Sequence, residues 1–95
     1  GPDILTATAR LYGFGVDEMT GSSRRQPLVL ARQIAMYLCR ELTDLSLPKI
    51  GVLFGGRDHT TVLHAVEKIR RIMTTDREVF DRVSQLTQEL RKTPV

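Results

Sequence analysis

The chain has 95 residues, 41% of them hydrophobic, and its 14 Lys and Arg against 11 Asp and Glu give a net charge of +3. This length supports one small domain and excludes a second. The single Cys39 excludes an internal disulfide and is expected to be a small core residue in a reducing compartment, and no apolar run reaches the roughly twenty residues of a membrane span. Gly1-Pro2 is interpreted as a tag-cleavage scar on an excised domain, which leaves residues 3–95 as the single domain.

The first part of the chain predicts helix followed by a basic loop. Helical spacing of apolar residues predicts a helix over residues 3–12, with Gly13 ending it. The segment that follows is too short for more than one turn of helix, over about residues 16–19. The stretch over 21–26 is typical of an irregular basic loop. From Met19 to Arg40 the chain has no acidic residue. A local basic surface is therefore predicted, with a polyanion as its natural partner; chance clustering on a solvated face is the alternative.

Two more helices are predicted in the middle of the chain. Pro27 suits the first turn of a helix that should run to about Thr43, and the polar face of this helix carries Gln33 and Arg40, with Arg32 on a flank. A following short helix over about 47–54 is expected to be capped by a serine.

The stretch from Gly55 to about Thr75 predicts the most informative helix. The two glycines permit a sharp turn, Asp58 is placed to cap the helix, and the polar residues 59–61 fill its first turn. Apolar residues then recur as one buried stripe, and Thr61, Ala65 and Lys68 share a flank. Such a mixture of small, hydroxyl and basic side chains suits base edges in a major groove, whereas the alternative is an ordinary solvated helix start.

The last part of the chain predicts one more helix, with Thr75 and Glu78 spaced as a capping box and apolar residues repeating up to Leu90. No strand pattern occurs anywhere. The predicted fold is therefore all-α, a small helical bundle that contains a Trp-repressor-like helix-turn-helix variant, with its core over about residues 27–75.

Three motifs carry a resemblance to a known family. The run Gly56-Arg57-Asp58-His59-Thr60-Thr61-Val62 resembles the signature of the bacterial replication initiator family DnaA, in its C-terminal duplex-DNA-binding domain. The runs over residues 31–36 and 47–51 stand in that family's order and approximate spacing. The resemblance covers essentially the whole chain from Asp3 onward.

The resemblance implies sequence-specific binding of duplex DNA at DnaA boxes of the TTATNCACA type at a replication origin, in the cytoplasm and associated with the nucleoid. It implies minor-groove entry by an arginine of the basic loop, either Arg24 or Arg25, and major-groove reading by the helix that starts near Asp58. The residues implied to read bases are Arg24, Asp58, His59, Thr60, Thr61 and Ala65. The residues implied to contact the DNA backbone or to support the site are Arg25, Arg32, Gln33, Arg40, Leu47, Lys49, Arg57 and Lys68, with the amides of Leu47 and Lys49 near a phosphate.

Other kinds of site are disfavoured by the residues. The glycines of 51–58 have P-loop spacing, but arginine replaces the lysine and aspartate the hydroxyl, so no nucleotide cofactor is expected. His59 and His64 point in different directions on a helix, so no metal site is expected either. The family's ATP-binding module has no counterpart in this chain, and an enzyme is not predicted. The remaining alternative is a helical interaction module that docks an acidic regulatory protein through the face from His59 to Lys68.

Overall fold

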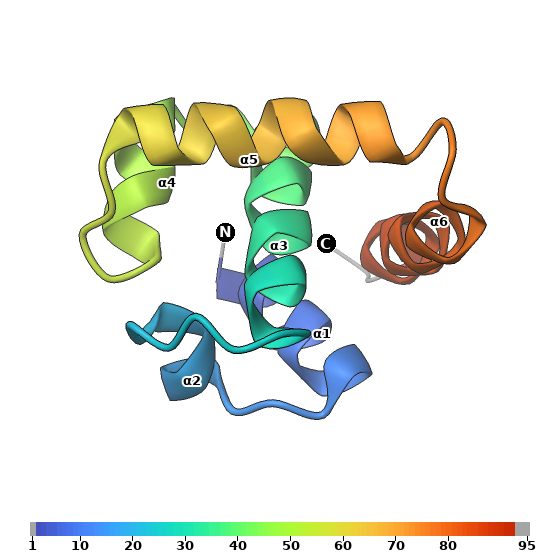
Figure 1. Ribbon diagram of the computed structural model, residues 1–95, viewed down its shortest axis with the longest axis horizontal. Coiled ribbons are helices and arrows are strands. Elements are labelled where there is room, and N and C mark those ends of the chain that lie inside the picture. Colours follow the sequence, from blue (N-terminus) through green and yellow to red (C-terminus); the bar gives the residue numbers. More distant parts are fainter. Residues whose placement is uncertain (1, 93–95) are drawn as a thin grey trace.

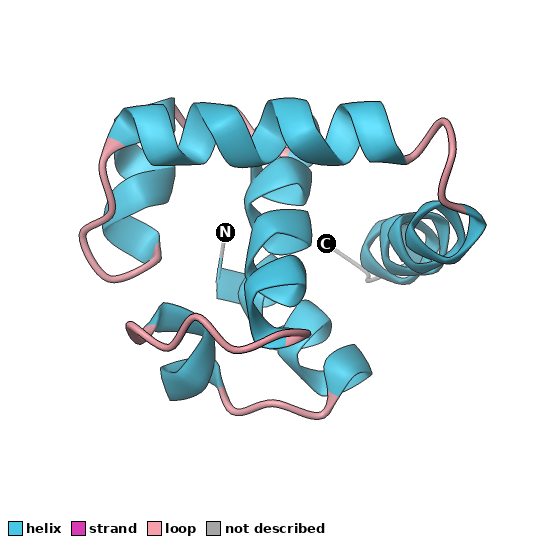
Figure 2. Cartoon of the chain, in the orientation of Figure 1, coloured by secondary structure: helices cyan, strands magenta, loops and turns pink. Residues whose placement is uncertain are grey.

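The computed structural model describes residues 2–92, and within this part the chain folds into helices joined by short loops, with no strand (Figures 1 and 2). The helices are α1 (Pro2–Tyr12), α2 (Val16–Thr20), α3 (Leu28–Leu42), α4 (Leu47–Leu53), α5 (His59–Ile72) and α6 (Arg77–Lys92). The expected all-α bundle is confirmed. Gly1 of the expected scar and residues 93–95 of the expected domain lie outside the described residues.

Helix α3 forms the centre of the bundle because apolar side chains occupy most of its circumference. It stands between α1 and α5, which cover its two ends (Figure 1), and Ala31, Ile34 and Ala35 are each 0% exposed. Helices α2, α4 and α6 complete the core around it, contributing among others Met19, Ile50 and Leu86. Burying such side chains contributes roughly 1.5 to 3 kcal/mol each, which is the main source of stability in an all-helical domain of this size. The single core fixes where the surface residues lie.

Helices α4 and α5 form the helix-turn-helix pair. Ser46 caps α4 as predicted, because its hydroxyl accepts from the Lys49 amide at 3.3 Å. The turn that follows folds back on α4, and the Gly51 carbonyl accepts from the amides of Gly56 at 3.0 Å and Arg57 at 2.9 Å. A Cβ at Gly51 would lie 2.0 Å from the Arg57 carbonyl oxygen, so only glycine allows the two backbones to come this close.

The helix ends differ from the predictions in three places. Pro27 lies at the N-cap of α3 and not in its first turn, and α5 ends at Ile72 and not near Thr75. The predicted capping box at Thr75 and Glu78 is wrong. Asp76 takes that position, because its carboxylate accepts from the Val79 amide at 3.2 Å. An aspartate next to a threonine offers two cap candidates, and sequence spacing alone does not choose between them.

The buried thiol of Cys39 leads to a prediction about pH. Burial raises its pKa to about 11 from an ordinary value of 9.0, and the side chain is 0% exposed as expected. Below pH 9 both folded and unfolded chains keep the proton, so stability is unaffected there. As pH rises from 9 to 11, only the unfolded chain ionises, and the free energy of unfolding should fall by about 2 to 3 kcal/mol.

Urea unfolding at several pH values in this window should show that decline for the unmodified chain and a smaller one for Cys39→Ala. The two tyrosines with raised pKa values, Tyr12 and Tyr37, are common to both proteins and cancel in the comparison. Equal pH dependence in the two proteins would contradict the prediction.

Candidate nucleic-acid interface

A groove of about 830 Å³ opens on one face of the bundle, between the loop that follows α2 and the side of α5, with α3 as its floor. In Figure 1 the loop after α2 passes in front of one end of α3, and α5 crosses the opposite end of α3. The groove lies between the loop and α5. We call it the basic groove. Its lining comprises Thr20, Gly21, Ser22, Arg24, Gln26, Val29, Arg32, Gln33, Met36, Gly55, Arg57, Thr61, His64, Ala65 and Lys68.

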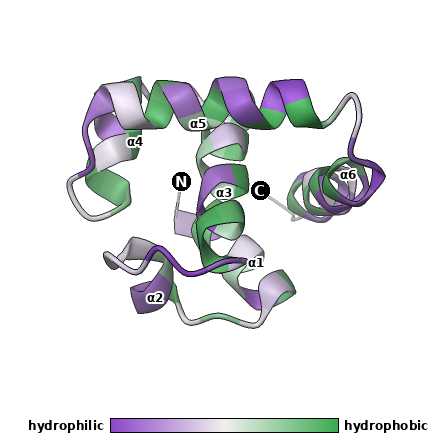
Figure 3. Ribbon diagram, viewed as in Figure 1, coloured by the Kyte–Doolittle hydropathy of each residue, from purple (hydrophilic) through white to green (hydrophobic). Residues whose placement is uncertain are grey.

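The charge of the basic groove has one sign. Arg24, Arg32, Arg57 and Lys68 are among its lining residues, which include no Asp or Glu. The loop that forms one rim is nearly neutral where it leaves α2 and becomes strongly hydrophilic on its way to α3 (Figure 3). A concave surface of a single sign concentrates the field of its charges, so this face attracts polyanions more strongly than the net charge of +3 alone suggests.

Helix α5 supplies one wall through the flank that the sequence predicted. Thr61, Ala65 and Lys68 of the predicted flank line the groove, and His64 lines it with them. The buried stripe of the same helix is confirmed, because Val62 is 0% exposed. Ala65 shares the predicted flank with Thr61 and Lys68, but it is only 4% exposed. Ala65 lies at the boundary between this flank and the hydrophobic core, and its methyl group protrudes little into the groove.

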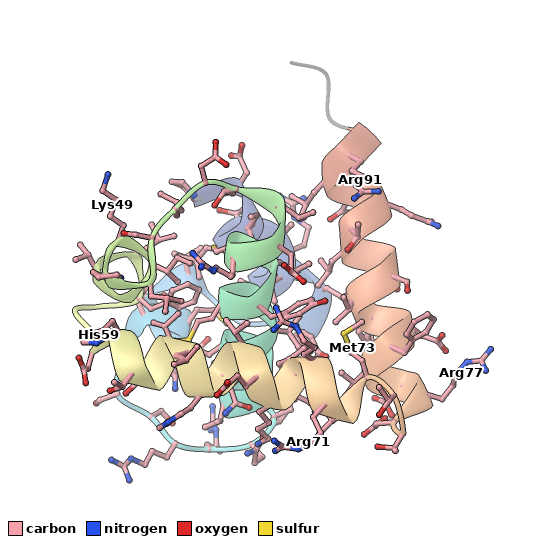
Figure 4. The ribbon with its side chains drawn as sticks, turned by 90° about the horizontal axis from the view of Figure 1, so that it is seen from above. Lys49, His59, Arg71, Met73, Arg77 and Arg91 are labelled. Carbon is pink, nitrogen blue, oxygen red and sulfur yellow. The ribbon has the colours of Figure 1, made fainter. Side chains whose placement is uncertain are left out.

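Thr61 is the residue of the first turn of α5 that lines the basic groove, and the residues before it lie outside that lining. Asp58, His59 and Thr60 are exposed, and Figure 4 shows His59 at the beginning of the helix. Asp58 occupies the N-cap position, but the expected capping hydrogen bond to an amide is not made. Its carboxylate instead accepts from the Thr60 hydroxyl and lies 3.1 Å from the His59 Nδ1.

The hydrogen bond from Thr60 is also the main reason why the pKa of Asp58 is lowered, and the electrostatic interaction with the neighbouring His59 adds to it. The backbone amides of His59 and Thr60 lie close enough to the carboxylate to lower its pKa further, without the geometry of a capping bond. Asp58 is therefore an anion held in place beside two polar side chains. The turn presents both donors and acceptors to the outside, which is what reading base edges requires.

The loop over residues 21–26, which we call the basic arm, separates the two arginines that the sequence could not tell apart. Arg24 lines the basic groove, whereas the Arg25 guanidinium lies 3.7 Å from the Glu18 carboxylate on the outer side. Both side chains belong to exposed residues. Of the two arginines, Arg24 is therefore the one whose side chain lies at the basic groove.

Arg32 is not on the polar surface, so that expectation is wrong. The residue is 5% exposed, and its guanidinium donates to three carbonyls: Met19 at 2.7 Å, Ser23 at 2.8 Å and Glu18 at 3.0 Å. Burial is the main reason why its pKa is lowered, and the nearby charge of Arg57 contributes. Its position in α3 lies next to the start of the basic arm. There it satisfies the Met19 and Ser23 carbonyls and adds a second hydrogen bond to the Glu18 carbonyl, which already accepts from the Gly21 amide at 3.2 Å.

Arg57 makes a matching set of contacts from the other side. One terminal nitrogen donates to the Phe54 carbonyl and, at 3.5 Å, to that of Thr20, while the other donates to the Gly21 carbonyl. Burial lowers its pKa. Sequence reasoning missed this pair of arginines as anchors of one segment, because the contacts of Arg57 span 36 and 37 positions and leave no local pattern.

The other predicted residues lie in different places. Gln33 lines the basic groove, and its Oε1 is buried and without a hydrogen-bond partner among the described residues. Arg40 lies outside the groove lining and donates to the Leu45 carbonyl at 3.4 Å. Leu47 and Lys49 begin α4, and Lys49 points outward (Figure 4). The Lys49 amide already donates to Ser46, so its expected availability to a phosphate is wrong, and only its side chain is free to reach one.

No group of three or more metal-ligand side chains occurs within residues 2–92. Gly51, the first glycine of the P-loop-like spacing, lies inside α4, whereas a P-loop begins directly after a strand. None of the helices in the described part is long and apolar enough to cross a bilayer.

Comparison with known proteins gives one consistent result. A family model described as "Bacterial dnaA protein helix-turn-helix" matches residues 2–69. Among curated relatives, the chromosomal replication initiator protein DnaA of Cutibacterium acnes is 56% identical over 89 residues, which cover 94% of this chain and 18% of that protein. The protein of the same name from Leifsonia xyli is 56% identical over 90 residues, covering 95% and 19%, and that from Corynebacterium jeikeium is 50% identical over 88 residues, covering 93% and 15%. The chain thus spans less than a fifth of the length of these relatives.

Proposed function

Because this chain belongs to the bacterial DnaA family and matches its helix-turn-helix domain, we propose that it binds short asymmetric duplex sites of the DnaA-box type and so supports initiation at a replication origin. DNA binding in replication initiation follows from the family. What we propose beyond this is a preference for a box sequence, contacts in both the major and the minor groove of the DNA, and a role for each residue. The observation that carries it is the basic groove, free of carboxylates in its lining and bordered by the exposed first turn of α5.

The proposed reading of bases uses both borders of the groove. The first turn of α5 enters the major groove, where Asp58, His59, Thr60 and Thr61 meet base edges, and Ala65 allows close approach because it carries only a methyl group. Arg24 extends from the basic arm into the adjacent minor groove. Arginine suits that place because a narrow minor groove concentrates negative potential.

The remaining contacts are proposed to hold the DNA backbone and the site itself. Arg25, Arg40, Lys49 and Lys68 supply positive charge near phosphates, with Leu47 at the start of α4 and Gln33 beside the groove floor. Arg32 and Arg57 hold the start of the basic arm in place and do not contact DNA in this proposal, since their donors already bond to protein carbonyls. Such backbone contacts fix orientation on the duplex but do not select sequence.

Titration of a matched and a scrambled duplex at several salt concentrations tests the proposal. With roughly four to six phosphate contacts, the logarithm of the binding constant should fall with the logarithm of salt with a slope of about −4 to −5 for both duplexes. The matched duplex should bind more tightly at every salt concentration, because base contacts add to the phosphate contacts. Equal affinity for the two would contradict sequence-specific reading. Failure to bind either duplex would favour the alternative, an acidic regulatory protein bound on the same face.

A further inference from the structure

The turn between α4 and α5 is docked against the end of α2, which is where the basic arm begins. Gly55 makes the closest approach, because a Cβ built on it would lie 2.3 Å from the Thr20 carbonyl oxygen. Arg57, two residues further on, donates to the carbonyls of Thr20 and Gly21. The contact thus joins Thr20 and the first residue of the basic arm, Gly21, to the residues just before the first turn of α5.

A second anchor holds the same segment from α3. Arg32 uses its Nε and both terminal nitrogens on the carbonyls of Glu18, Met19 and Ser23. Ser23 immediately precedes Arg24, so the anchored part of the chain ends one residue before the proposed minor-groove side chain. Hydrogen bonds from a charged donor are stronger than neutral ones, and these donors are partly or fully removed from competing water. The start of the arm is therefore fixed to the bundle, while the arm itself is exposed.

We propose that Gly55 and Arg57 are positioning residues, which set the distance between the basic arm and the first turn of α5 so that both can engage one duplex at once. The inference rests on the proposed function and adds a determinant of specificity that lies outside the DNA contacts. Arg57 belongs to the motif that suggested DNA reading, yet both its terminal nitrogens donate to protein carbonyls. Its part in binding is to place the arm.

The chain offers a matched pair of glycines to test this. Gly55 and Gly56 both have φ of +83°, so alanine at either position carries the same backbone strain. The added Cβ meets the Thr20 carbonyl at position 55 but finds nothing within 4 Å at position 56. Gly55→Ala should displace the end of α2, and Gly56→Ala should leave it in place. Thermal unfolding of both variants establishes that they are folded at the temperature of the titrations.

The experiment is a double-mutant cycle on DNA affinity. The arm is inactivated by Arg24→Ala together with Arg25→Ala, which removes both candidate arginines, and binding of the matched duplex is titrated in the unmodified, Gly55→Ala and Gly56→Ala backgrounds. Independent sites give additive effects within about twofold. In the unmodified and Gly56→Ala backgrounds, loss of the arm should weaken matched binding by about tenfold or more. In Gly55→Ala the same loss should cost less than about threefold, because the arm is already out of place.

Arg57→Met supplies the second route, which also serves if Gly55→Ala does not fold. If Arg57 positions the arm, its loss and the loss of the arm should be non-additive; if it contacts a phosphate directly, the two losses should add. Additive effects in both Gly55→Ala and Arg57→Met would overturn the positioning role, as would an arm whose removal changes nothing in the unmodified chain. An unmodified chain that does not discriminate matched from scrambled duplex would instead overturn the proposed function itself.

Discussion

Replacing Gly51 with alanine is expected to destabilise the domain by about 3 kcal/mol or more, although the residue lies inside a helix. Helix propensity alone favours alanine over glycine by about 1 kcal/mol. The structure reverses the sign, because the new Cβ would lie 2.0 Å from the Arg57 carbonyl oxygen. That oxygen is backbone, so the turn between α4 and α5 would have to move, and with it the two hydrogen bonds that it donates to the Gly51 carbonyl.

Urea unfolding followed by circular dichroism measures this effect. Val52→Ala is the matched control in the same helix, since Val52 is 74% exposed and its truncation should change stability by no more than about 0.5 kcal/mol. A stabilised or unchanged Gly51→Ala variant would show that the two backbones can separate without cost. It would contradict the claim that the contact between α4 and the turn requires glycine.

The second large effect is expected in DNA binding, from removing both hydroxyls of the first turn of α5. The double substitution Thr60→Ala and Thr61→Ala should cost about 2 to 6 kcal/mol of affinity for a matched duplex, at about 1 to 3 kcal/mol for each base-reading group. Affinity for a scrambled duplex should change far less, because phosphate contacts remain. Both threonines are exposed, so the fold should persist.

The control for this prediction is Thr74→Ala with Thr75→Ala, an equally exposed pair just beyond the other end of α5 and outside the groove lining. It should leave both affinities unchanged. Arg40→Ala gives a further contrast, since loss of a phosphate contact should weaken matched and scrambled duplexes alike and flatten the salt dependence. Retained discrimination in the Thr60 and Thr61 double variant would place base reading elsewhere on the domain.

Most of the fold was predictable because local signals agree with the packing. Apolar periodicity located the helices of the described part other than the short α2, and Gly13, with φ of +77°, ends α1 as predicted. The errors fall at helix ends, where neighbouring residues compete for one cap, as Asp76 does with Thr75. The sequence underestimated how much of α3 is buried. A helix that is covered from several sides has fewer exposed positions than one apolar stripe in its sequence suggests.

The candidate site was predictable where it depends on one helix. The flank shared by Thr61 and Lys68 follows from helical geometry, and both residues line the basic groove. What depends on the meeting of distant segments was not predictable. Arg32 looks like a surface residue in the sequence because arginines usually are, and only the carbonyls at the end of α2 explain its burial. Whether the grouped residues read DNA stays a prediction, which the titrations address.

The anchoring of Arg32 and Arg57 has a consequence for the speed of encounter. Within the described residues, both guanidiniums bond only to uncharged carbonyls, so no carboxylate neutralises them. Their charge therefore still acts over distance and should accelerate the approach of a polyanion. The two arginines that anchor the loop thus also add to the positive electrostatic potential that the domain exerts at a distance.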